Sequence, residues 1–162
     1  MIFNFNAAEV FDIGVKIEEN GKKFYDEAVK VIEDAEVKAL FKDLGEQEVE
    51  HRQKFLQLKK ELPAQASQST VFDPNNEIDA YIKVTADNHV FLQKDFESRL
   101  ADIKDVRSAL RMAMEFEKDS VIFFLTIQDA TDDKKGKEFI GQLVKEEQEH
   151  LRRLSLQYKR LR

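Results

Sequence analysis

Apolar residues recur at helical spacing over two long stretches in the first part of the chain. The first stretch begins near Asn6, a candidate N-cap with Glu9 three residues later, and ends near Glu33. The second begins with Asp34 as a candidate N-cap and ends before Pro63. The connection between them is very short, so the pattern predicts an antiparallel helical hairpin.

The same periodicity returns in the last part of the chain. It covers residues 105–130 and then runs from about Asp132 to the end, again with a short connection. A second antiparallel hairpin is therefore predicted. Only five glycines and two prolines occur in the whole chain, which favours few long helices over many short strands.

Residues 64–104 separate the two hairpins. The stretch AQASQST is polar and has no period, but from Asn76 onwards apolar residues recur every three or four positions. This pattern predicts a continuous or broken helix. About 25 helical residues span roughly 38 Å, close to the length of a helical bundle. The segment is therefore predicted to be a long, partly helical crossover that returns the chain to the opposite end.

The two hairpins are copies of each other, because residue i of the first matches residue i + 99 of the second without a gap. The matched pairs are Glu18 with Glu117, Phe24 with Phe123, Asp34 with Asp133, Leu44 with Leu143, Glu48 with Glu147, Glu50 with Glu149 and His51 with His150. A helical hairpin cannot bury its apolar face alone, so the two copies should pack together. The prediction is one all-α domain, residues 1–162: an antiparallel four-helix bundle made of the repeats 1–63 and 105–162.

Composition excludes several classes of function. The formal net charge is −6, which argues against nucleic acid as a partner, and no segment is apolar enough to cross a membrane. The chain has no cysteine, so a metal site must be built from carboxylate and imidazole. The first residues lack a basic start followed by an apolar run, so no signal peptide is predicted and the cytoplasm is the expected compartment.

Two of the three histidines lie in Glu-x-x-His motifs, which pair Glu48 with His51 and Glu147 with His150. Residues three apart share a helix face, and the flanking positions on that face are apolar. Both motifs are therefore predicted to point into the core. An ionised side chain buried there is costly unless it is paired or bound to metal.

Glu18 and Glu117 lie on the apolar faces of the other two helices. Each precedes the motif glutamate of its own hairpin by 30 positions (48 − 18 and 147 − 117), and the midpoints fall on the predicted turns. Each carboxylate is thus about 15 residues, roughly 22 Å, from its turn, and the antiparallel partners come level. Gly21 and Ser120, three residues further on, leave room beside the two carboxylates.

Packing the hairpins together is predicted to bring six metal ligands to one level of the core: Glu18, Glu48, His51, Glu117, Glu147 and His150. Four carboxylates balance two divalent ions when both histidines are neutral. This is the ligand scheme of di-iron and di-manganese carboxylate bundles. Two iron ions are the expected cofactor, and manganese or zinc stays open because carboxylate and imidazole accept each of them. A metal-free hydrogen-bonded network is the alternative, which four clustered carboxylates make costly.

The stretches IEENGKKFYDEA and GEQEVEHRQKF, repeated as FEKDSVIFFLTI and KEEQEHLRRL, resemble the rubrerythrin-like branch of the ferritin-like superfamily. The resemblance covers nearly all of the chain outside the crossover, with all six ligand positions present in order. It implies a ferritin-like bundle, a di-iron site on those six residues, peroxide or dioxygen as the oxidant, and a homodimer.

The chain departs from full rubrerythrins in two respects. They carry a cysteine-rich rubredoxin domain that supplies electrons, whereas this chain has no cysteine, so a separate electron donor or Fe(II) itself is expected. They also commonly add a glutamate three residues after the third-helix ligand, where this chain has Ser120.

Two further residues are singled out near the predicted site. Tyr25 lies one helical face from Glu18 and is a candidate hydrogen-bond partner of a ligand, with simple packing as the alternative; its match in the second repeat is Phe124. His89, in the crossover, is predicted to be a satisfied core or interface histidine rather than a ligand.

Three functions remain in order of preference. The first is a di-iron redox enzyme that reduces peroxide or dioxygen, or oxidises Fe(II), at the dinuclear site. The second is an iron-storage or iron-handling subunit whose site is an entry port without true turnover. The third is a metal-independent interaction bundle.

Overall fold

The structure is a computed structural model that describes residues 7–61, 74–75, 77–131 and 134–161, and the structural statements below refer to these residues. They form helices and no strand. The helices are α1 (Ala7–Val31), α2 (Ala35–Glu61), α3 (Glu77–Asn88), α4 (Phe96–Ala101), α5 (Val106–Asp129) and α6 (Lys134–Arg160).

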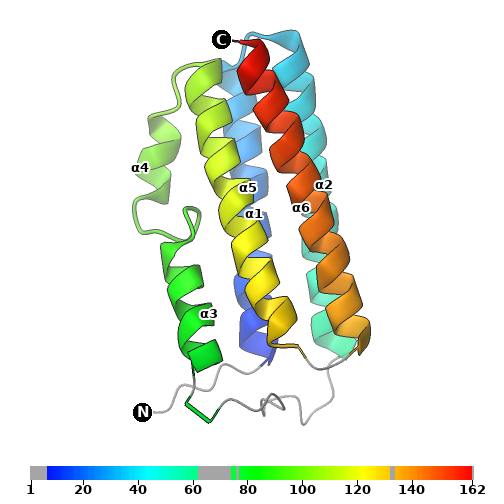
Figure 1. Cartoon of the computed structure of the whole chain (residues 1–162). Coiled ribbons are helices and arrows are strands. Elements are labelled where there is room, and N and C mark those ends of the chain that lie inside the picture. Colours follow the sequence, from blue (N-terminus) through cyan, green and yellow to red (C-terminus); the bar gives the residue numbers. More distant parts are fainter. Residues whose placement is uncertain (1–6, 62–73, 76, 132–133, 162) are drawn as a thin grey trace.

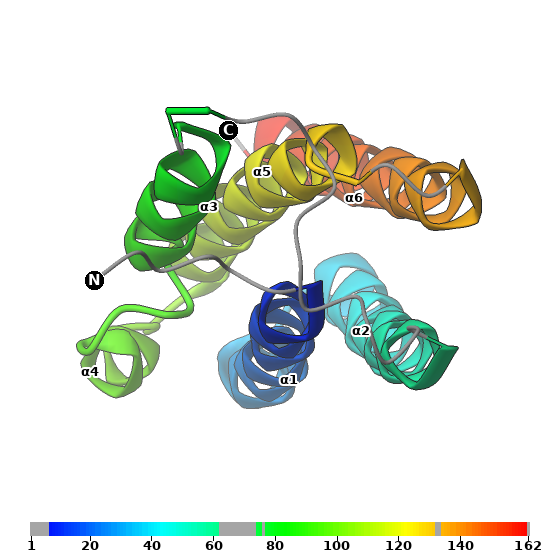
Figure 2. The ribbon, with the colours of Figure 1, turned by 90° about the horizontal axis from the view of Figure 1, so that it is seen from below.

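The four long helices α1, α2, α5 and α6 form an antiparallel bundle (Figure 1). α1 packs mainly against α2, and α5 against α6, which makes the two hairpins. The hairpins then meet through α1 against α5 and α2 against α6, as the view along the bundle shows (Figure 2). The predicted all-α four-helix bundle is therefore confirmed. None of the described helices combines the length and apolar character needed to span a bilayer.

Side-chain caps start two of the long helices. The carboxylate of Asp34 accepts a hydrogen bond from the main-chain N–H three residues on, at 3.0 Å, and so caps α2. Asp105 caps α5 in the same way, accepting from the Ser108 N–H at 2.7 Å, while the Ser108 hydroxyl accepts from the Asp105 N–H. The predicted helix starts at Asn6 and Asp132 lie outside the described residues.

The crossover contains α3 and α4, which follow each other along one side of the bundle from the end of α2 toward the start of α5 (Figure 1). α3 packs on α5, and α4 lies against α1. The predicted partly helical crossover is confirmed, and the broken form of its helix is the one observed.

The break follows from three consecutive buried side chains. His89, Val90 and Phe91 are each only 1% exposed. An α-helix turns by about 100° per residue, so three successive side chains cannot all face the bundle unless the helix ends. The main-chain groups freed by the break find side-chain partners. Asp119 accepts from the Val90 N–H at 3.1 Å, His89 Nδ1 accepts from the Phe91 N–H at 3.2 Å, and Asn20 donates to the Phe91 carbonyl at 2.6 Å.

Gly21 is fixed by close packing in the core. A Cβ at this position would lie 2.8 Å from the ring of Phe116 and 3.1 Å from a carboxylate oxygen of Glu48. At Gly141 on α6, by contrast, a Cβ would meet only the end of the flexible Gln128 side chain.

We expect Gly21→Ala to lower the free energy of unfolding by about 1–3 kcal/mol, because Phe116 and Glu48 are fully buried and have little room to move. Gly141→Ala should leave stability unchanged or raise it by up to about 1 kcal/mol through helix propensity. Urea denaturation of both variants, after a chelator has removed any bound metal, measures the two free energies of unfolding. Equal effects at the two positions would contradict the packing argument.

Candidate metal centre

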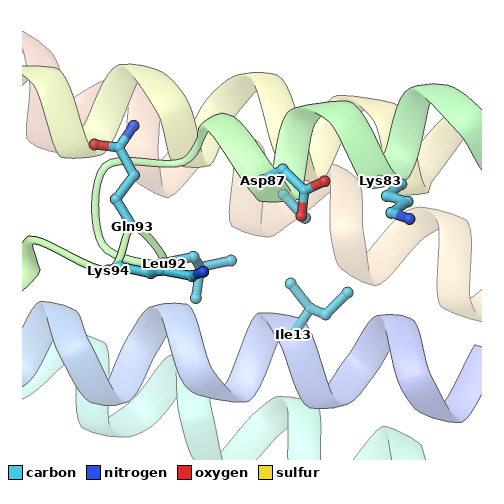
Figure 3. Close-up of a pocket in the computed structure, with 7 residues that line it drawn as sticks. Ile13, Lys83, Asp87, Leu92, Gln93 and Lys94 are labelled. Carbon is cyan, nitrogen blue, oxygen red and sulfur yellow. The ribbon is translucent and has the colours of Figure 1, made fainter.

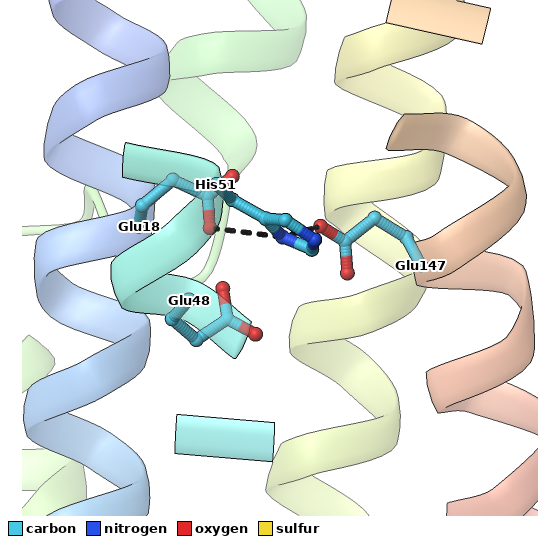
Figure 4. A group of neighbouring side chains, drawn as sticks. All are labelled: Glu18, Glu48, His51 and Glu147. Atoms are coloured by element: carbon cyan, nitrogen blue, oxygen red, sulfur yellow. Dashed lines mark ion pairs between the residues drawn. The ribbon is translucent and has the colours of Figure 1, made fainter. Parts of the chain in front are cut away.

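The six predicted ligands meet inside the bundle, and each side chain is at most 1% exposed. They come from all four long helices. Glu18 is supplied by α1, Glu48 and His51 by α2, Glu117 by α5, and Glu147 and His150 by α6. Figure 4 shows Glu18, Glu48, His51 and Glu147 converging between the helices.

The cluster divides into two overlapping groups of four residues. Within each group, one ligand atom from every residue lies within 4.8 Å of the others. The groups are Glu18, Glu48, His51 and Glu147, and Glu48, Glu117, Glu147 and His150. Glu48 and Glu147 belong to both groups, so they lie between the two halves, while each half has one further glutamate and one histidine of its own.

Glu147 lies between the two imidazoles. One carboxylate oxygen is 2.9 Å from His51 Nδ1 and the other is 2.9 Å from His150 Nδ1. The same ring nitrogens lie 3.7 Å from Glu18 and 3.4 Å from Glu117, respectively. The two rings are nearly parallel, with an interplanar angle of 13° and centroids 5.6 Å apart. Both imidazoles therefore turn Nδ1 toward the cluster.

The cluster contains every buried side-chain polar atom that lacks a hydrogen-bond partner among the described residues. There are nine such atoms: both oxygens of Glu18, Glu48 and Glu147, one oxygen of Glu117, and Nδ1 of His51 and His150. Some of them face each other as ion pairs, as the two Glu147 oxygens face the two Nδ1 atoms, but without the geometry of a hydrogen bond. Each buried unsatisfied group costs about 1–3 kcal/mol. Carboxylate oxygens and imidazole nitrogens are donors that divalent iron, manganese and zinc accept, so the residues present fit a pair of such ions.

Burial and repulsion favour the protonated forms of two of the glutamates. Burial, together with the neighbouring Glu18 carboxylate, raises the pKa of Glu48 well above its usual range. Burial and the Glu147 carboxylate raise the pKa of Glu117 to about 8, although His150 opposes the shift. Both groups are therefore harder to ionise than an exposed glutamate.

The pKa shifts of the two histidines and of Glu147 favour the charged forms of these groups instead. Burial alone would lower the pKa of His51, but Glu147 and Glu146 outweigh it and raise the pKa to about 12. Glu117 and Glu147 likewise overcome burial at His150 and raise its pKa to about 10. Burial disfavours the Glu147 carboxylate, yet the two histidines hold its pKa well below the usual range. An ionised Glu147 and charged imidazole rings therefore stabilise one another.

Tyr25 is fully buried, and its hydroxyl donates a hydrogen bond to Oε1 of Glu117. The structure therefore gives it a hydrogen bond to a predicted ligand rather than packing alone, although the acceptor belongs to the second repeat and not to its own helix. Burial and the nearby Glu117 carboxylate raise the pKa of Tyr25 well above its usual value, so the phenol keeps its proton.

His89 is buried beside the centre and has partners on both ring nitrogens. Nε2 lies 3.1 Å from the Ser120 hydroxyl, and Nδ1 accepts from the Phe91 N–H. Burial lowers its pKa to about 3, so the ring is neutral. The prediction of a satisfied core or interface histidine is confirmed, and the histidine lies in the core. The crossover thus places the His89 ring beside Ser120.

Two residues next to the centre were missed from the sequence. Oε2 of Glu146 lies 2.7 Å from His51 Nε2, and Oε1 of Gln47 lies 2.9 Å from His150 Nε2. They hold the outer edges of both imidazoles. A signal was available, because Gln47 and Glu146 match at the repeat offset of 99 and each immediately precedes a motif glutamate.

A surface pocket lies apart from this cluster. Figure 3 shows its lining by side chains of α1, α3 and the turn after α3: Ile13, Lys83, Ala86, Asp87, Leu92, Gln93 and Lys94. None of the six predicted ligands lines it. The buried cluster, and not this pocket, is therefore the candidate functional site.

Comparison with known proteins agrees with this fold. The model of the rubrerythrin family matches residues 9–158. Among solved structures, the chain is similar to a Thermotoga maritima protein assigned as ferritin-like and diiron-carboxylate, with a TM-score of 0.76, 20% identity and 98% of each chain covered. This likeness confirms the predicted ferritin-like bundle. The comparison with curated proteins found no match.

Divalent metal is expected to raise the melting temperature, because a ligand bound only by the native state adds stability. The gain is about 2.7 kcal/mol when free metal is about 100 times the Kd. Glu48→Ala or His150→Ala should remove most of this gain, whereas Glu50→Ala, an exposed neighbour on α2, should keep it. Calorimetry with Zn²⁺ makes the measurement, and full gains in both ligand variants would show the ligand assignment to be wrong.

Metal binding is also expected to release protons. The pKa values of Glu48, Glu117, His51 and His150 are raised in the absence of metal, which favours their protonated forms, while metal ligands must be deprotonated. Raising the pH from 6 to 8 should therefore increase the affinity. Calorimetric titration with Zn²⁺ in buffers of different ionisation enthalpy measures the protons released. Binding without proton release would contradict these protonation states.

Proposed function

Because the chain belongs to the rubrerythrin family, we propose that it is a di-iron redox protein that reduces peroxide or dioxygen, or oxidises Fe(II). Family membership and the buried glutamate–histidine cluster together indicate a dinuclear metal site. The observation that carries the proposal is that nine buried polar atoms without a hydrogen bond, all those found among the described residues, lie on the six predicted ligands and have only one another as charged neighbours. Such a concentration of unsatisfied donors and acceptors is explained by metal ligation.

We propose a role for each ligand. Glu18 and His51 would hold one ion, and Glu117 and His150 the other. Glu48 and Glu147 would serve both, because each belongs to the two overlapping groups. Iron bound there would supply one electron per ion, two in all, which together with two protons convert hydrogen peroxide into two molecules of water.

Surrounding residues pack against the cluster and hold the ligands in place. The Phe116 ring stacks on Phe91 at a centroid distance of 4.0 Å, and both rings are buried beside the cluster. Tyr25 packs edge-on against Phe116 and fixes one oxygen of Glu117. Since each ligand is at most 1% exposed, only small molecules such as peroxide, dioxygen or a ferrous ion are suitable substrates.

Electrons for repeated turnover would come from outside this chain. It has no cysteine, and so it cannot itself hold the four-thiolate iron centre that serves this purpose in full rubrerythrins. We propose that a separate donor protein, or Fe(II) as substrate, fills that role.

Stopped-flow mixing of Fe(II)-loaded protein with hydrogen peroxide and with dioxygen tests the proposal. We expect iron oxidation at least about tenfold faster than for Fe(II) in buffer, since each 1.4 kcal/mol of barrier lowering gives that factor. Glu48→Ala should lose the acceleration, and Glu50→Ala should retain it. Oxidation no faster than in buffer with either oxidant would show the proposed function to be wrong.

The same preparation separates redox turnover from iron storage. Light scattering reports the size of the assembly, and iron analysis reports the iron content per chain. A small assembly holding two irons per chain supports the redox proposal. A large shell that accumulates many irons per chain supports storage instead.

A further inference from the structure

The two motif histidines are each oriented by the opposite hairpin. Nδ1 of both rings points into the cluster, so Nε2 points outward. Outside, Glu146 of the second hairpin meets His51 of the first, and Gln47 of the first meets His150 of the second. Each contact therefore ties one repeat to the other at the level of the metal centre.

These two contacts occupy equivalent places but differ in charge. Gln47 and Glu146 are matched by the repeat offset, and both offer a side-chain oxygen to an Nε2–H group. Accepting that hydrogen fixes the tautomer whose Nδ1 lone pair faces the cluster. At His51 the acceptor is a carboxylate, whereas at His150 it is a neutral amide.

The difference in charge affects the ligand strength of the two imidazoles. A carboxylate acceptor makes a stronger hydrogen bond than an amide and raises the basicity of the ligating nitrogen. Lys54 lies 3.5 Å from the same oxygen of Glu146, and both side chains are 42% exposed, so water and this ammonium reduce the effect without reversing it. His51 is therefore the better donor to metal.

Glu18 and Glu117, the glutamates that each belong to only one half of the cluster, differ in a way that also favours metal on the His51 side. Tyr25 donates a hydrogen bond to Glu117, which shares its half of the cluster with His150. A donor bound to a carboxylate oxygen competes with metal for that oxygen's electrons. Neither oxygen of Glu18 has such a partner among the described residues. Phe124, the residue equivalent to Tyr25 in the second repeat, has no hydroxyl to offer.

We infer that the two halves of the centre are unequal, with metal binding more tightly and first on the Glu18–His51 side, and that Glu146 and Gln47 are the positioning residues that set this order. The inference rests on the proposed dinuclear site. It adds an order of filling and two residues outside the six ligands.

Zinc titration followed by nitrogen-15 NMR of the histidine rings tests the order directly. Zn²⁺ has no redox chemistry, so the readout is independent of enzyme activity. The His51 Nδ1 resonance should move during the first equivalent and that of His150 during the second, with His51→Gln and His150→Gln providing the assignments.

Exchanging the two outer residues supplies the decisive variants. Glu146→Gln gives both histidines the same amide acceptor and should weaken the first step by about 10- to 100-fold, which brings the two steps together. The double exchange Gln47→Glu with Glu146→Gln should raise the affinity of the His150 side relative to that of the His51 side. Glu149→Gln removes the same charge from α6 at an exposed position and should leave the order unchanged.

The outcomes distinguish this inference from the proposed function. Equal filling of both sides in the unmodified protein, or equal effects of Glu146→Gln and Glu149→Gln, would overturn the inference while leaving a dinuclear site intact. If two equivalents of zinc move neither resonance, the ligand assignment fails and the proposed function fails with it.

Discussion

The concentration of four carboxylates at one level of a dry core is the constraint on which this structure depends. Like charges at this separation cannot all be ionised without positive charge among them. Among the protein's own groups, the two histidines stabilise the Glu147 carboxylate, while burial favours the protonated forms of Glu48 and Glu117. A pair of divalent ions would balance the charge of all four carboxylates, so the same side chains suit a cluster with protons and a cluster with metal.

Much of this centre could be predicted because it depends on spacing within single hairpins. The 30-residue interval between glutamates fixes their level once the turns are known, and Asp34, next to the midpoint at Glu33, is both the predicted and the observed cap. The helix face on which each ligand lies follows from the apolar positions around it. Such features are local to one hairpin, and local features are what a sequence pattern records.

Features that depend on the relative rotation of the hairpins could not be predicted. Glu146 reaches His51, and Tyr25 reaches Glu117, only because α1 packs on α5 and α2 on α6. The break at His89 had a similar cause, since it requires Asp119 and Asn20 from two bundle helices to receive the freed main-chain groups. Periodicity indicated a helix there, but its end was set by tertiary contacts.

The covalent joining of the two repeats has an evolutionary consequence. Two separate hairpins of identical sequence, associating as a symmetric pair, would change both halves of their shared centre with every mutation. A single chain has no such restriction, so one copy can carry Tyr25 while the other carries Phe124, and one can carry Gly21 while the other carries Ser120. Duplication followed by fusion is thus a route by which a twofold-symmetric ancestor acquires separate specialisation of each half.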